Sequence, residues 1–214
     1  FRFHPVLRQI KELLDNRSLG KVLHARVHWG EYLPDWHPWE DYRVSYAARA
    51  DLGGGVVNTL SHPFDYLRWM LGEVEALGAC TAHLSALELD VEDHADVQMR
   101  FNSGAMATVH LDYYQKPPSH RLEITCEEGL IQWDNANGEA VIFYADPREK
   151  TRLSPPKGFE RNSMFLDEMR HFLRLCKGET LDYCSLNDGI RVQQMVETIK
   201  RSNEAGGMLL PLEW

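Results

Sequence analysis

The chain has 214 residues, of which 43% are hydrophobic and 26% are charged, a composition typical of globular proteins and enough to bury a core without disulfides or metal. Its 23 basic and 32 acidic residues give a net charge of −9, and no lysine and arginine cluster interrupts this excess, so we expect no nucleic-acid partner. No apolar run is long enough to span a membrane, and no signal-peptide pattern is present. We therefore expect no membrane association and a cytoplasmic location.

The cysteines and the first residue bear on the chain's environment and completeness. Cys80, Cys126, Cys176 and Cys184 form no C-x-x-C pair, so we expect reduced thiols rather than disulfides or a zinc site. The chain opens on Phe1 rather than Met and runs directly into a helical pattern. We therefore expect a fragment of a longer protein.

The first third of the sequence predicts a helix, a strand and a long aromatic loop. Apolar residues recur at helical spacing from Pro5 to Asn16, and period-two alternation over residues 21–29 predicts a half-buried strand. Residues 31–52 show no sustained period and are rich in tryptophan and tyrosine. After three glycines, residues 56–71 predict a second helix, in which Pro63 removes a backbone donor and causes a kink or a restarted turn.

The rest of the chain predicts a sheet followed by helices. Alternating apolar residues between turns over 73–146 predict an antiparallel meander, which brings the total to about six or seven strands. Residues 164–176 form one amphipathic stripe, and a second helix begins near Ile190, with Ser185 and Asn187 as possible caps. These segments predict an α+β fold with an open, mainly antiparallel sheet and flanking helices, in a single domain over residues 1–214.

The strongest candidate for chemistry lies after the three glycines that begin at Gly53. Asn58, His62 and Asp65 are spaced i, i+4 and i+7, so on one uninterrupted helix they share a stripe. A neutral imidazole is a suitable base for a hydroxyl group, and a neighbouring amide or carboxylate can orient it. The glycines would let backbone approach a ligand closely. The alternative is that His62 packs at a helix surface and the glycines only turn the chain.

Residues of the aromatic loop form a second candidate site. Aromatic faces complement the C–H face of a sugar ring, and arginine or histidine can reach its hydroxyl groups. Packing between subunits is an equally good explanation. Tyr113, Gln115, His120 and Arg121 flank another loop and could contact the same substrate, although polar strand ends are the simpler explanation. The loop residues concerned are Trp36, His37, Trp39, Tyr42 and Arg43.

The sequence supports no metal site, no nucleotide-binding turn and no serine nucleophile. Glu92, Asp93, His94 and Asp96 resemble a metal-ligand cluster, but neighbouring strand residues point to opposite faces, so we expect a solvated strand end and no metal. The triple glycine lacks the third glycine of a dinucleotide-binding turn and no buried strand precedes it. No P-loop and no G-x-S-x-G motif occurs.

Three stretches together resemble a known family. They are Arg2-Phe3-His4-Pro5, the segment from Gly53 through His62 and Asp65 to Leu67, and residues 127–133, EEGLIQW. Their order, with the strand and aromatic loop between them, is similar to the C-terminal domain of the Gfo/Idh/MocA family of sugar and inositol oxidoreductases. The resemblance covers nearly the whole chain.

The resemblance implies a domain like the C-terminal domain of glyceraldehyde-3-phosphate dehydrogenase, which supplies the substrate site and whose sheet face often forms a homo-oligomer. It also implies an N-terminal Rossmann domain, absent from this chain, that binds most of an NAD or NADP cofactor. The glycine fingerprint and the Glu-Lys-Pro lysine of that domain would precede Phe1. The implied activity is hydride transfer between a sugar or cyclitol carbon and nicotinamide, with this chain inactive alone.

Carried over residue by residue, the resemblance makes His62 the base that takes the hydroxyl proton. The family often has aspartate where this chain has Asn58, which can orient an imidazole but supplies no negative charge. Asp65 matches a frequent family aspartate and could supply part of that charge. Because of Asn58, a non-catalytic sugar-binding or dimerisation module is the alternative function.

Overall fold

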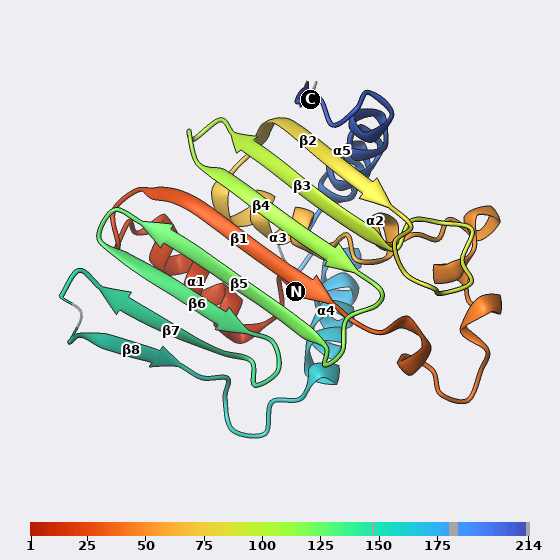
Figure 1. Cartoon of the computed structure of the whole chain (residues 1–214). Helices are drawn as coiled ribbons and strands as arrows, with labels where there is room; N and C mark the ends of the chain where they lie inside the picture. Colours follow the sequence, from red (N-terminus) through yellow and green to blue (C-terminus); the bar gives the residue numbers. More distant parts are fainter. Residues whose placement is uncertain (147, 180–183, 213–214) are drawn as a thin grey trace.

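The computed structural model describes residues 1–146, 148–179 and 184–212. Within them a nine-stranded sheet has the order β8-β7-β6-β5-β1-β4-β3-β2-β9, shown in Figure 1. The first strand, β1, pairs in parallel with β4 and antiparallel with β5. The strands are β1 (Val22–Gly30), β2 (Val74–Ala82), β3 (His94–Phe101), β4 (Met106–Asp112), β5 (Ser119–Cys126), β6 (Gly129–Asp134), β7 (Glu139–Tyr144), β8 (Lys150–Leu153) and β9 (Leu210–Pro211).

Helices cover one face of this sheet and leave the other face open, as the view of Figure 1 onto the open face shows. Four short 3₁₀ turns occupy the aromatic loop between Leu33 and Leu52. Ser185 caps α5, as its sequence position predicts, by accepting a hydrogen bond from the Asp188 amide. The helices are α1 (Pro5–Asp15), α2 (Val56–Thr59), α3 (His62–Leu71), α4 (Arg161–Cys176) and α5 (Leu186–Glu204).

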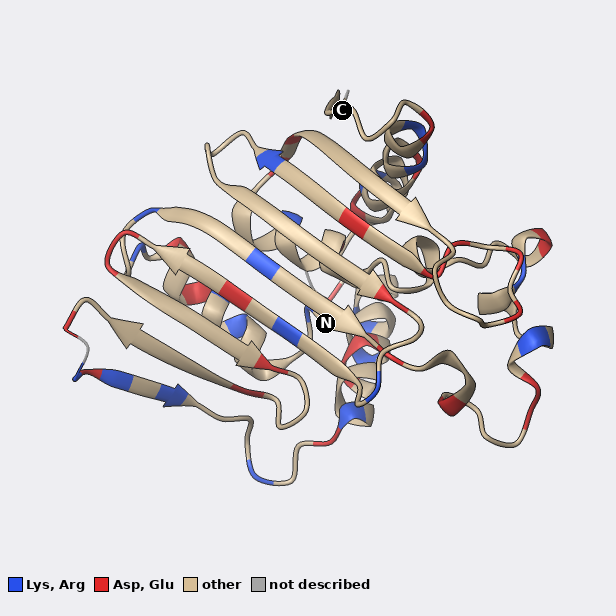
Figure 2. Ribbon diagram, viewed as in Figure 1, with Lys and Arg blue, Asp and Glu red and all other residues tan. Residues whose placement is uncertain are grey.

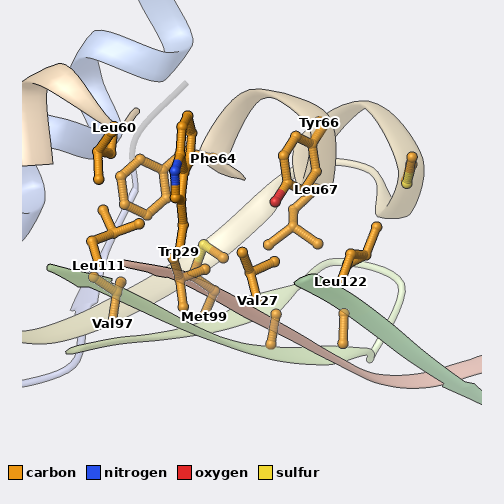
Figure 3. Close-up of a cluster of buried hydrophobic side chains, with 14 of the residues drawn as sticks. Val27, Trp29, Leu60, Phe64, Tyr66, Leu67, Val97, Met99, Leu111 and Leu122 are labelled. Atoms are coloured by element: carbon orange, nitrogen blue, oxygen red, sulfur yellow. The ribbon is translucent and has the colours of Figure 1, made fainter. Parts of the chain in front are cut away.

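The core lies between the helices and the sheet. Alternate residues of β1, such as Val27 and Trp29, point toward the helical side and are buried. There they meet Phe64 and Leu67 of α3, as Figure 3 shows. Burial of each such side chain stabilises the fold by roughly 1.5–3 kcal/mol relative to exposure. This layer fixes the position of α3, whose first residue is His62.

Two expectations about the sheet need correction. Nine strands are present among the described residues rather than six or seven, because the edge strand β8 is short and polar and the edge strand β9 has only two residues, so neither shows a period in the sequence. The strands after β2 also do not form one uninterrupted meander, since β1 separates β4 from β5. Mixed α+β architecture and a mainly antiparallel open sheet are confirmed.

The amphipathic stripe of α4 is not part of the core. Only Met164 of this stripe is buried, whereas Phe165, Met169, Phe172 and Leu173 are each more than half exposed. A period in the sequence shows that a helix has an apolar face, but it does not show what covers that face. Among the described residues, no helix combines the length and the apolar character needed to cross a membrane.

An ion-pair network joins the N-terminal segment to α3 and α5. Arg2 pairs with Asp65 at 2.7 Å and lies 3.2 Å from Asp188. Arg68 pairs with the same Asp188 oxygen at 2.6 Å and with Glu73 at 2.7 Å. Both arginine side chains are more than 90% buried, so their carboxylate partners compensate the cost of removing two positive charges from water.

Replacing Asp188 with asparagine tests this network. Although partial burial opposes ionisation, hydrogen bonds from Arg68 and Ser185 and attraction to Arg2 hold the pKa of Asp188 well below its usual range. A lowered carboxyl pKa stabilises the folded state above the unfolded pKa of about 3.9, and this contribution is lost as the pH falls further. We expect D188N to reduce the free energy of unfolding by roughly 2 kcal/mol at pH 7 in urea denaturation, and the difference to shrink below about pH 4.

The matched control is D167N on α4. Asp167 pairs with Arg170, but both side chains are more than half exposed, so its loss should change the free energy of unfolding by less than about 0.5 kcal/mol. Equal destabilisation by the two variants, or a D188N effect that is independent of pH, would contradict the role given to the network.

Candidate active site around His62

His62 begins α3 and faces two adjoining cavities of about 500 and 410 Å³. The residue as a whole is solvent-accessible, yet protein side chains surround it. The Phe1 ring lies 5.3 Å away between centroids, and the Trp29 ring lies 6.0 Å away and within 21° of parallel. This apolar setting favours the uncharged imidazole.

The same surroundings determine the protonation of His62. Burial of the imidazole in the cavity wall lowers the pKa of His62 to about 4, against a weaker opposing effect of Asp65. The ring is therefore neutral at pH 7, and one ring nitrogen is free to accept a proton.

The larger cavity joins His62 to the aromatic loop. Trp36 and His37 line it together with His62, so the structure brings together these three residues from the sequence prediction. The Trp36 indole nitrogen is buried and has no hydrogen-bond partner among the described residues. Aromatic rings, carboxylates, an arginine and a neutral imidazole suit a small polyhydroxylated ligand. The other lining residues are Trp29, Glu31, Tyr32, Asp35, Tyr46, Thr59, Leu60, Pro118 and Arg161.

A stack of buried rings supports the wall behind His62. Trp29 stacks on His120 at 4.1 Å and 3° from parallel, and Nε2 of His120 is 3.1 Å from the Tyr66 hydroxyl. Burial and the nearby positive groups hold the pKa of His120 well below its usual range. With His120 neutral and clamped between Trp29 and Tyr66, the position of Trp29 beside His62 is fixed.

Asn58 does not join His62 on one helical stripe. The chain leaves helical geometry at Leu60, so α2 ends at Thr59 and α3 starts anew at His62, which confirms the predicted break near Pro63. The Asn58 amide instead donates to the carbonyls of Gly53 and Gly54 at 3.1 and 2.9 Å. Because the Asn58 amide binds these glycine carbonyls and not His62, the prediction that Asn58 orients the imidazole is wrong.

Two of the three glycines, Gly54 and Gly55, lie against other parts of their own chain. A side chain on Gly54 would collide with backbone carbonyls of the aromatic loop, and one on Gly55, whose φ is +102°, would collide with the Glu92 carboxylate. The glycines thus let the start of α2 dock against these groups. The expected close approach to a ligand is not what requires them.

Asp65 faces the N-terminal segment. Its two carboxylate oxygens accept hydrogen bonds from Nε and a terminal nitrogen of Arg2 at 3.0 and 2.7 Å. It lines the smaller cavity with His62 and acts on the imidazole through its charge. Asp65 therefore positions the Arg2-Phe3-His4 segment, which closes one side of that cavity.

Three predicted substrate residues lie outside the larger cavity. The Tyr42 hydroxyl accepts a hydrogen bond from the Glu88 amide, and exposed Arg43 pairs with Asp41 and Glu88. Tyr113 is fully buried behind Trp36, with ring centroids 5.6 Å apart. The 3₁₀ turns of the loop carry Tyr42 and Arg43 away from this cavity, and Tyr113, which follows β4, lies in the core. Contact of these three residues with substrate stays a prediction.

Several cavity residues escaped the sequence prediction. Arg161 comes from the first turn of α4 and borders both cavities, whereas Glu31 and Asp35 come from the start of the aromatic loop. No motif marks these residues, because their convergence depends on the fold. Glu31 and Asp35 are acidic residues close to Trp36 in the sequence, and this closeness was the one signal that could have identified them.

The predicted solvated strand end has a different arrangement. Asp93 is fully buried and accepts hydrogen bonds from the Leu84 and Ser85 amides, which fastens the loop before β3. His94 and Asp96 instead contact His110 on the open face. As strand alternation predicts, the side chain of Asp93 points to a different face from that of His94. The surroundings of His94 and Asp96 are completed by His110 on the neighbouring strand β4.

Comparison with known proteins agrees with this architecture. The profile of the GFO/IDH/MocA C-terminal domain matches residues 7–132. The chain is 35% identical over 82 residues, which are 37% of this chain and 21% of the relative, to the uncharacterized oxidoreductase sll0816 of Synechocystis. It is 27% identical to the uncharacterized oxidoreductase YrbE of Bacillus subtilis over 99% of this chain and 61% of YrbE.

Solved structures share the whole arrangement. Levoglucosan dehydrogenase in complex with NADH and levoglucosan superposes with a TM-score of 0.87 at 17% identity, over 100% of this chain and 65% of that one. GenD2 from gentamicin A biosynthesis, in complex with NAD, has a TM-score of 0.78 at 25% identity, over 100% of this chain and 62% of GenD2. The chain thus spans less than two thirds of each of these proteins. With the profile match covering more than half of its residues, the chain belongs to the Gfo/Idh/MocA family through that family's C-terminal domain.

Proposed function

We propose that this chain is the single substrate domain of an NAD(P)-dependent oxidoreductase that transfers hydride between a hydroxyl-bearing carbon of a sugar or cyclitol and nicotinamide. The observation that carries the proposal is the neutral, solvent-accessible His62 in the wall of a cavity lined by aromatic rings and carboxylates. Relatives named as oxidoreductases and a neighbour solved with NADH and levoglucosan support it. On this proposal the chain has no activity by itself.

In the proposed reaction, different side chains accept the proton, bind the substrate and stabilise the charge that develops. A neutral His62 takes the proton of the reacting hydroxyl group as hydride leaves the same carbon. Glu31 and Asp35 accept hydrogen bonds from other hydroxyl groups, and Trp36 offers its ring to the C–H face of the sugar. Positive charge that develops on His62 is stabilised by Asp65, whose charge already acts on the ring.

The smaller cavity fits a nicotinamide ring beside His62. Phe1, Met164 and Phe165 give it apolar walls, and Arg161 borders both cavities. Bound there, NAD(P) would supply the hydride acceptor or donor. The described residues contain no glycine-rich turn between a strand and a helix for the phosphates, so the proposal places most of the cofactor on an N-terminal Rossmann domain.

The open sheet face is the proposed surface for homo-oligomers. Helices cover the opposite face only, and Figure 2 shows acidic and basic residues of the exposed strands interspersed across the open face. A twofold axis brings the same patch of both copies together, and charges of both signs on this face allow opposite charges to meet across such a contact. A cavity of about 660 Å³ on this face, bordered by Arg26, Glu123 and Asp134, leaves room for partner side chains.

The free thiols support a reducing compartment. Cys80, Cys126 and Cys176 form no disulfide bond, and the exposed Cys80 and Cys176 lie in ordered elements. Exposed free thiols persist where glutathione keeps them reduced. We therefore place the protein in the cytoplasm.

An NMR titration tests the protonation state that the mechanism requires. Because the folded pKa of His62 lies below the ~6.5 of an unfolded histidine, the ring should protonate with a midpoint at about 4 and remain neutral at pH 7. The imidazole C–H signals of the chain, assigned by the signal missing in H62Q, give this midpoint directly. A midpoint near 6.5 would show that the cavity does not lower the pKa of His62, and it would contradict the proposal that the cavity keeps the imidazole neutral.

Turnover of the full-length protein that contains this chain tests the reaction itself. With a panel of monosaccharides and cyclitols, we expect reduction of NAD⁺ or NADP⁺, and we expect H62Q to lower kcat by about 10²–10⁴-fold, since it removes the general base. Cofactor affinity, measured by fluorescence titration, should not change. His83 contacts the Leu87 carbonyl away from both cavities, so H83Q is the matched control.

Wild-type turnover in H62Q would exclude His62 as the base. If the full-length protein bound a sugar but transferred no hydride with either cofactor, the chain would instead be a non-catalytic sugar-binding module.

The oligomer is tested by placing a charge at the centre of the open face. Thr108 pairs with Arg26 on β1 and with Gln98 on β3, so T108K puts a second positive charge beside Arg26, which a sheet-to-sheet interface would bury. Analytical ultracentrifugation should show a dimer for the wild-type chain and a monomer for T108K, with unchanged circular dichroism. N102K, in the exposed β3–β4 turn, is the control; a monomeric wild type would refute this interface.

A further inference from the structure

We propose that the open sheet face holds a binding site for a divalent transition metal of the Zn²⁺ class, with His28, His110 and Asp112 as ligands and Gln115 as a fourth donor. This open-face site lies on the opposite side of the sheet from His62. It goes beyond the proposed function and does not depend on it.

Strand register brings the first three ligands together. His28 of β1 stands opposite His110 of the parallel strand β4, and Gly30 stands opposite Asp112. The two imidazole rings stack at 4.7 Å between centroids and 10° from parallel. One ligand atom from each of His28, His110 and Asp112 lies within 4.8 Å of the others. Ligands of a tetrahedral metal, each about 2.0–2.2 Å from the ion, lie about 3.3–3.6 Å apart, so the three side chains would have to move slightly closer together to coordinate it.

Gln115 supplies a fourth oxygen at the same point. Its amide nitrogen donates to the Pro117 carbonyl at 3.1 Å, which turns Oε1 toward Nε2 of His28, where the two form a short contact. A side chain on Gly30 would collide with Oδ2 of Asp112 and Oε1 of Gln115. The missing side chain of Gly30 therefore creates the space in which the donors converge.

The surrounding hydrogen bonds orient two of the ligands. Asp112 is buried, and its Oδ1 accepts from the Tyr114 and Gln115 amides at 3.0 and 2.7 Å. Its Oδ2 is left 3.0 Å from Nε2 of His110. On the other side of the ring, Nδ1 of His110 is 2.8 Å from the Asp96 carboxylate. A carboxylate that accepts from Nδ1–H directs the Nε2 lone pair toward a metal, an arrangement common among metal-bound histidines.

A proton is the competing occupant. A protonated His110 can donate to Asp96 and Asp112 at once, which would satisfy all three side chains without a metal. A proton leaves two separate hydrogen-bonded pairs, His110 with Asp112 and His28 with Gln115, whereas a metal bound among these side chains would use all four as donors. Imidazole nitrogen with carboxylate oxygen is a donor set that suits Zn²⁺, Co²⁺ and Ni²⁺ rather than Mg²⁺ or Ca²⁺.

Titration of the tag-free chain with Co²⁺ and Zn²⁺ at pH 8 tests the open-face site. We expect one equivalent of Co²⁺ to bind with the intense visible absorption of a four-coordinate ion, and Zn²⁺ to displace it with a dissociation constant on the order of 1 μM or tighter. H28Q and H110Q should each abolish this spectrum. D96N, which removes only the orienting carboxylate, should weaken Zn²⁺ binding by about 10–100-fold.

The control is H24Q, because His24 lies on the open face of β1 but four residues from His28 and belongs neither to the group of His28, His110 and Asp112 nor to the neighbouring group of His94, Asp96 and His110. H62Q serves as a second control on the opposite face. Failure of Co²⁺ to bind, or binding that survives both H28Q and H110Q, would overturn the proposal and leave a protonated His110 as the occupant. Circular dichroism of each variant separates lost binding from lost folding.

Discussion

The alternation of side chains along β1 is the constraint on which the rest of the structure depends. Because β1 lies between β4 and β5, every residue of it is committed to one face or the other. Trp29 enters the helical side and supports the wall beside His62, while its neighbour His28 stands on the open face. A shift of one residue in the register would exchange the two and destroy both sites at once.

Much of the fold follows from patterns that are local in the sequence. The helix over residues 5–15, the cap at Ser185 and the break before α3 depend on neighbouring residues only, and the sequence predicts each of them. Strand order is different, because the pairing of β1 with β4 joins residues about 80 positions apart and no local pattern specifies it. The exposed stripe of α4 shows the same limit, since amphipathicity does not identify the surface that covers it.

The candidate site also contains some residues that local sequence patterns identify and others that only the packing of the fold brings together. Residue types and neighbouring residues single out His62, Trp36 and His37 in the sequence, and the fold brings these three residues to one cavity. Asn58 failed because the spacing i, i+4 has meaning only on a continuous helix, and Leu60 interrupts this one. Arg161 could not be predicted, since only the packing of α4 places it beside His62.

The place of β1 in the sheet also has a consequence for biosynthesis. This strand leaves the ribosome first among the strands, yet both of its partners follow much later in the chain, within residues 106–126. Until they emerge, an apolar strand with two unpaired edges has to remain free of other chains. The hairpins that come after it can form as they are made, but the two halves of the sheet join only when β1 is inserted between them. Assembly is therefore governed by a late, long-range step, the kind of contact that slows folding most.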